Sequence, residues 1–153
     1  GKPYVTQKLN KILKDYKTIR IDDYRIKYSD GSFESDKKTL EIFSIDCVKE
    51  KNAIIEMSGV GKSAYALKEK LNNEKYVLVQ IDTSLDTCLS RIESKDFNVV
   101  PYPVNENVED SIRKIDKLIK DGFINKIFDN PMASFKIKDD DDLSSILKCL
   151  GCL

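Results

Sequence analysis

The sequence of 153 residues contains no histidine, and this absence removes several kinds of chemistry at once. A catalytic triad and a general acid or base built on imidazole both need that side chain, and so does a histidine-ligated metal site. Any catalysis by this chain must therefore use Asp, Glu, Lys, Arg, Ser or Cys side chains.

Cysteine is scarce as well, with Cys47, Cys88, Cys149 and Cys152 as its four examples. Four scattered thiols are too few for the disulfide framework of a small secreted domain, so we interpret them as reduced thiols of a cytoplasmic protein. Cys149 and Cys152 have the spacing of a redox or metal motif, but no second pair completes such a site. We interpret this pair as a helix end with Gly151 as its cap.

The chain also lacks an excess of charge of either sign, because 26 Lys and Arg residues balance 26 Asp and Glu residues. Proteins that bind duplex nucleic acid usually present a positive field, so nucleic acid is not expected as the main partner. The longest apolar run is far shorter than a membrane span, and the N-terminus does not have the charged and then apolar layout of a signal peptide. No membrane partner is expected either.

Apolar residues make up 41% of the chain. This share is enough for the core of one domain, which we expect to cover residues 1–153. Helical spacing of these residues predicts helices near 5–16, 34–51, 62–71, 85–92, 108–119 and 143–150. Short apolar runs predict strands at 18–22, 53–57, 76–82 and 124–129. Strands that alternate with helices favour an α/β fold, a parallel sheet of four or five strands with helices on both faces.

The strand expected at 53–57 leads into a Gly-x-Gly-Lys-Ser turn and a helix, which is most of a phosphate-binding loop. In such a loop the glycines let backbone N–H groups surround an anion, while the lysine and the hydroxyl reach phosphate and magnesium. The residues that can supply these parts are Ser58, Gly59, Gly61, Lys62 and Ser63. The full pattern needs a further glycine where this chain has Glu56, a carboxylate close to the expected anion. An ordinary strand-to-helix turn is the alternative interpretation.

A second group of charged residues follows the strand expected at 18–22. Asp22 and Asp23 stand at its carboxyl end, where open α/β sheets place their ligands, and Arg25 comes directly after them. A carboxylate there could take a proton from an acceptor hydroxyl or hold a metal, and the arginine could bind an acceptor phosphate or carboxylate. A solvated turn is the simpler interpretation.

Charged residues near the other predicted strands add further candidates. Arg91 and Lys95 lie one helical turn apart and could close over a phosphoryl group, although an exposed basic pair would have the same spacing. Asp82 and Asp129 each end an apolar run, as a magnesium-orienting aspartate does. Strand ends also carry aspartate for turn formation alone.

With these residues the chain resembles the P-loop kinase superfamily of small phosphotransferases, which includes nucleotide, shikimate and gluconate kinases and zeta-toxin-like kinases. The likeness covers nearly the whole chain: 21–25 is similar to the acceptor-site segment, 77–92 to the fourth strand with its arginine-bearing lid helix, and 124–130 to the last strand. The resemblance implies binding of ATP or GTP with Mg²⁺ and transfer of the γ-phosphoryl group to a small acceptor. It implies Asp22 or Asp23 as base or acceptor ligand and Arg91 as the lid residue.

Two alignments with that family stay open. In the first, Gly1 and Lys2 end the phosphate loop, 53–57 is the third strand, and the first strand lies upstream of residue 1 or comes from another chain of an oligomer. Pro3 then stands where the family has a magnesium-binding hydroxyl. In the second, 53–63 is the first strand with its loop, Lys62 binds phosphate and Asp82 orients magnesium. A catalytically inactive binding or interaction domain is the alternative function.

Overall fold

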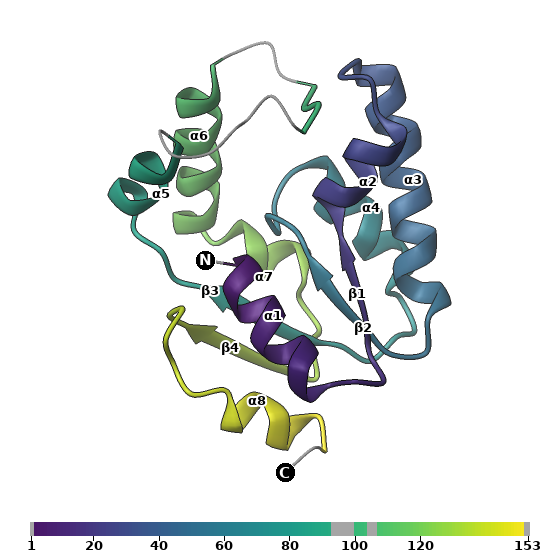
Figure 1. The fold of residues 1–153 in the computed structure, drawn as a ribbon, viewed down its shortest axis with the longest axis vertical. Helices are drawn as coiled ribbons and strands as arrows, with labels where there is room; N and C mark the ends of the chain where they lie inside the picture. The colour runs from purple at the N-terminus through teal and green to yellow at the C-terminus, as the bar shows by residue number, and fades with distance from the viewer. Residues whose placement is uncertain (1, 93–99, 104–106, 152–153) are drawn as a thin grey trace.

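The computed structural model describes residues 2–92, 100–103 and 107–151. Helices and strands alternate along much of the chain, and no helix within the described ranges is both long and apolar enough to cross a bilayer. The elements are α1 (Lys2–Ile12), β1 (Lys17–Arg20), α2 (Ile21–Tyr28), α3 (Phe33–Lys49), β2 (Ala53–Glu56), α4 (Lys62–Lys70), β3 (Val77–Ile81), α5 (Leu85–Ile92), α6 (Val108–Lys120), α7 (Phe123–Ile127), β4 (Ala133–Ile137) and α8 (Ser144–Cys149) (Figure 1).

The described strands form two separate parallel sheets of two strands each. β1 pairs with β2, where Lys17 lies opposite Ala53, and β3 pairs with β4, where Val77 lies opposite Ala133. The prediction of one parallel sheet of four or five strands is therefore wrong for the described residues. Strand-forming patterns show which segments are extended, but they carry no information on whether β2 and β3 are hydrogen-bonded to each other.

The last predicted strand is also wrong, because most of residues 124–129 belong to helix α7. Gly122, with a φ of 83°, lets the chain turn directly from the end of α6 into α7. Ile124 and Ile127 are then buried at helical spacing. A short apolar run fits a buried helix and a buried strand equally well, so its periodicity could not decide between them.

β4 (Ala133–Ile137) is a strand that the sequence patterns did not bring out. Ser134 and Lys136 are exposed, whereas Ala133 and Phe135 are half-buried and Ile137 is buried. This alternation is typical of a strand with one side on a core. The polar and aromatic residues of the segment gave it no continuous apolar run.

The strand expected at 18–22 is shorter than predicted, because helix α2 begins at Ile21, immediately after β1. Asp22 and Asp23 consequently lie in the first turn of α2. Carboxylates at that position complement the positive end of the helix dipole. The two aspartates therefore have a structural role in addition to the functional one expected from the sequence.

Two hydrophobic clusters are packed around the strands. The larger cluster consists of Ile19, Ile21, Leu40, Phe43, Cys47, Val60, Ala64, Leu67, Leu71, Ile124, Ile127 and Phe128. The smaller cluster consists of Val5, Leu9, Leu13, Ile137, Leu143, Ile146 and Leu147. Half-buried strand residues join both, with Ile55 and Leu78 against the larger cluster and Ile54 and Val79 against the smaller one. Because successive strand side chains point to opposite faces, the two clusters cover opposite faces of β2 and β3.

Cys47 lies inside the larger cluster, and its burial raises the pKa of the thiol to about 12. Since the thiolate is the reactive form, we expect iodoacetamide at mildly alkaline pH to label the half-buried Cys88 and Cys149 and to leave Cys47 unlabelled until the protein unfolds. Peptide mapping by mass spectrometry measures the labelled fraction at each site. Equal labelling of Cys47 and Cys88 in the native protein would contradict this burial.

Candidate functional site

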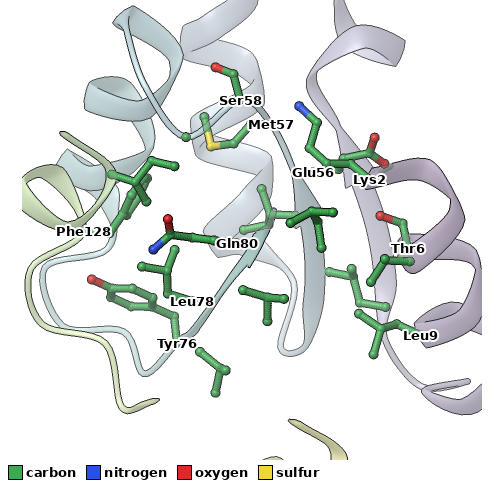
Figure 2. Close-up of a pocket in the computed structure, with 18 of the residues that line it drawn as sticks. Lys2, Thr6, Leu9, Glu56, Met57, Ser58, Tyr76, Leu78, Gln80 and Phe128 are labelled. Atoms are coloured by element: carbon green, nitrogen blue, oxygen red, sulfur yellow. The ribbon is translucent and has the colours of Figure 1, made fainter. Parts of the chain in front are cut away.

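A large cavity lies between β2 and β3, on the edge of each strand that has no partner strand among the described residues. Its volume is about 1590 Å³. Figure 2 shows Thr6 and Leu9 of α1 on one side of it and Tyr76 and Phe128 on the other. The two separate sheets therefore meet edge to edge across this cavity, with β2 on one side and β3 on the other.

The cavity has an apolar middle and a polar end. Its middle is lined by the side chains of β2 and β3 together with residues of both hydrophobic clusters. The polar end, at the carboxyl ends of β2 and β3, is lined by Lys2, Glu56, Ser58, Asp82, Thr83 and Arg91. Ligands of parallel α/β proteins commonly bind at the carboxyl ends of the strands, so this polar end is the candidate functional site.

Glu56 is neutralised at this site by a neighbouring strand. Arg20 lies opposite Glu56 in the β1–β2 pairing, and its Nε donates to Glu56 Oε2 at 2.8 Å. The Glu56 side chain is only 14% exposed. A partly buried ion pair of this kind reduces the repulsion that Glu56 would exert on a bound anion. The sequence showed that the Glu56 carboxylate would repel an anion, but it did not show that Arg20 is its partner, because Arg20 lies far away along the chain.

The Gly-x-Gly-Lys-Ser turn has the backbone of a tight loop. Gly59 and Gly61 have φ angles of 80° and 83°, and Gly61 is the residue before α4. A Cβ atom added to Gly59 would lie 3.3 Å from Ile124 Cγ1, so the turn approaches α7 closely. Ser58 Oγ donates to the carbonyl oxygen of Val60 at 3.0 Å, and Val60 itself is buried. These contacts pack the turn against the larger cluster.

The charged part of that turn points elsewhere. Ser58 and Gly59 line the cavity, whereas Gly61, Lys62 and Ser63 do not. The Nζ atom of Lys62 stands 5.5 Å from the centroid of the Phe33 ring, and Ser63 is buried. The structure thus separates Lys62 from the polar end, where it brings Lys2 instead.

Asp22 and Arg25 belong to a different cluster, around α2 and α3. Arg25 Nε donates to Asp36 Oδ1 at 2.9 Å, and Arg25 Nη1 lies 3.8 Å from Asp22 Oδ1. The guanidinium also lies 5.2 Å from the centroid of the Tyr102 ring. Burial, followed by the charge of Asp22, raises the pKa of Tyr102 above its usual range. None of these residues, nor Asp23, lines the cavity.

Tyr102 and Asp36 are members of this cluster that the sequence did not single out. Tyr102 stands between two prolines, and nothing in that segment indicates its contact with α2. Asp36 is 5% exposed although it lies in the first turn of α3, a position that is usually solvated. Only the fold, which brings residues far apart in sequence together, shows that Arg25 is already held by a buried carboxylate.

The remaining predicted residues are divided between two places. Arg91, in the last turn of α5, has its Nη2 atom 3.3 Å from Asp139 Oδ2, and Asp82 follows β3 directly. Asp129 instead pairs with Lys68 at 2.9 Å, outside the cavity lining. Gly1 and Lys95 lie outside the described residues.

The donor atoms at the polar end suit a phosphate better than a metal held by protein alone. Among the described residues, no group of three or more Cys, Asp or Glu side chains is arranged to hold a metal ion. Asp82 offers one carboxylate, and magnesium is commonly bound through one or two carboxylates together with water and substrate phosphates. Lys2 and Arg91 bring positive charge of the kind that a phosphate needs to this end, although Asp139 already neutralises part of the charge of Arg91.

This chain matches no family model, no curated protein and no solved structure.

Proposed function

We propose that this chain binds a nucleoside triphosphate with magnesium at the polar end of the cavity and transfers the γ-phosphoryl group to a small acceptor. The observation that carries the proposal is the shared lining of one cavity by Lys2, Arg91 and Asp82 at the carboxyl ends of β2 and β3. The kinase-like sequence features point to the same chemistry. Phosphoryl transfer needs little covalent chemistry from the protein, so positioning and charge neutralisation by a few residues suffice.

Each of the three residues has a part in the proposed reaction. Lys2 binds the phosphates, Arg91 neutralises charge on the transferred group, and Asp82 orients magnesium. Arg20 keeps the Glu56 carboxylate neutralised beside them. Asp22 and Asp23, in the first turn of α2, lie outside the cavity lining, so neither of them is assigned as the acceptor base.

The free thiols support a reducing compartment for this activity. Cys47, Cys88 and Cys149 are unpaired among the described residues. Proteins of the cytoplasm keep their thiols reduced. We therefore place the proposed activity in the cytoplasm.

Titration calorimetry with Mg·ATP tests the proposal on the wild type, Lys2→Ala and Lys62→Ala. We expect Lys2→Ala to weaken binding at least about tenfold, since a charge-assisted contact to phosphate is worth about 1.5–3 kcal/mol. Lys62→Ala removes the same charge from a residue outside the cavity and should leave the affinity unchanged. An absence of binding by the wild type, or an equal loss in both variants, would refute the assignment.

A binding domain without catalysis is the second candidate, and Pro3 favours it. Proline stands in the first turn of α1, one residue after Lys2, and offers neither a hydroxyl for magnesium nor a backbone N–H. A domain of this kind would bind Mg·ATP in the calorimeter without forming ADP. A coupled assay for ADP, run with a panel of small hydroxylated acceptors, separates the two candidates.

A further inference from the structure

We propose that the apolar middle of the cavity between β2 and β3 is a docking groove for an extended, uncharged, apolar segment of another polypeptide. The backbone of that segment would pair with β2 on one side and with β3 on the other. This inference is independent of nucleotide binding, because it uses the apolar middle of the cavity rather than its polar end.

The first observation is that two strand edges without partners face the same cavity. Among the described residues, β2 pairs only with β1 and β3 pairs only with β4, while residues 53–56 and 77–81 both line the cavity. Figure 1 shows β2 and β3 as the inner strands of the arrangement β1, β2, β3, β4. An edge strand presents a row of N–H and C=O groups, and these groups are costly to leave unpaired in a buried place. One extended segment between the two strands would satisfy both rows.

The second observation is that both strands contribute to the same two hydrophobic clusters. Ile55 of β2 and Leu78 of β3 contact the larger cluster, whereas Ile54 and Val79 contact the smaller one. A segment between the strands would therefore send alternate side chains into the two clusters. Since both of its faces would be covered, it should be apolar throughout, as buried parallel strands are.

The charges around the cavity set the chemistry of the segment. β2 residues 53–55 and β3 residues 77–79 are all apolar, whereas the charged lining residues flank these strands or belong to other elements, such as Lys136 of β4 and Asp116 of α6. Lys2 and Asp82 are at the polar end, and Lys51 and Lys75 precede the two strands. A charge placed in the middle would lose its hydration without gaining a partner. The groove therefore selects an uncharged centre and tolerates charged flanks.

The size of the cavity agrees with a peptide occupant. Pockets for small molecules usually measure about 300–1000 Å³, and this cavity, with its polar end included, measures about 1590 Å³. The strands that border it have four and five residues, which sets the length of the paired segment. A second copy of the chain is a poor occupant, because each described strand is already paired along one edge within its own sheet.

Fluorescence anisotropy tests the groove with a fluorescein-labelled peptide that has a central Val-Ile-Val-Ala-Val segment between pairs of lysines. We expect saturable binding without nucleotide. The same peptide with alternate backbone amides methylated should bind at least about tenfold more weakly, because main-chain hydrogen bonds supply the affinity of strand addition. No saturable binding, or equal binding of the two peptides, would overturn the proposal.

Two further measurements locate the peptide. Amide hydrogen exchange of the wild type should show new protection at 53–57 and 77–81 and none in α3; protection confined to α3 would refute the groove. Val79→Asp should abolish binding, whereas Ile26→Asp, which places the same charge on a half-exposed residue of α2 outside the cavity, should leave it unchanged. Unchanged binding by Val79→Asp would count against the proposal. The exchange experiment decides on its own if Val79→Asp does not fold.

Discussion

Replacement of Phe43 by alanine lowers the free energy of unfolding by about 4 kcal/mol, the largest expected effect of a single core substitution in this chain. Phe43 is 0% exposed and lies in the middle of α3, inside the larger cluster. Its ring meets the ring of Tyr24 edge to face, with centroids 5.6 Å apart. The substitution removes apolar burial and this aromatic contact, and it leaves a cavity that the neighbouring helices cannot fill without moving.

Urea denaturation followed by circular dichroism measures this loss. Phe33→Ala is the matched control, because Phe33 begins the same helix and is 50% exposed. The control should cost less than about 1 kcal/mol, mainly through the cation contact between Lys62 and its ring. If Phe43→Ala lost no more stability than Phe33→Ala, the larger cluster could not be the core of the fold.

The helix that carries Phe43 is a part of the fold that the sequence predicted well. Leu40, Phe43 and Cys47 recur at helical spacing over a long segment, and the predicted bounds of 34–51 differ little from those of α3. α6 and α8 were anticipated for the same reason. Long periodic segments depend on local geometry, and local geometry is what a single sequence expresses most directly.

The arrangement of the strands could not be predicted in this way. Whether β2 pairs with β3 depends on contacts between segments that are distant along the chain, and the alternation of side chains is the same in either case. The error at 124–129, where a strand was predicted and helix α7 was found, has a related cause. The positions of Ile124 and Ile127 fit a strand or a helix, and the helix forms after the turn at Gly122. Tertiary packing decided both outcomes.

The structure brings some of the candidate residues from the sequence to one cavity and leaves others outside it. Lys2, Asp82 and Arg91 were candidates from sequence and do line one cavity, but so were Lys62 and Ser63, which do not. The glycines of the turn determine its backbone shape, whereas the burial of neighbouring side chains determines where Lys62 points. The pairing of Arg20 with Glu56 required the register of β1 and β2, which no local pattern contains.

Asp36→Ala should lower the free energy of unfolding by about 3 kcal/mol, because it leaves the guanidinium of Arg25 partly buried without its main partner. The Asp36 side chain is 7% exposed and that of Arg25 is 15% exposed, so water replaces the lost carboxylate only in part. Asp22, at 3.8 Å from Arg25, lies too far away and is too exposed to substitute for it fully. Arg25→Ala should also lower the free energy of unfolding, because it leaves the more deeply buried Asp36 carboxylate without its partner.

The double variant Arg25→Met/Asp36→Leu distinguishes a buried ion pair from simple loss of packing. Removal of both charges together, with apolar side chains in their place, should recover most of the stability lost in Asp36→Ala, because no unpaired charge remains. Glu34→Ala is the control for an exposed pair on the same helix, since Glu34 and Lys38 have side chains 86% and 77% exposed. That control should change stability by less than about 0.5 kcal/mol. The stability lost in the double variant could instead equal the sum of the losses in Arg25→Ala and Asp36→Ala. In that case Arg25 and Asp36 would contribute independently and would not act as an ion pair.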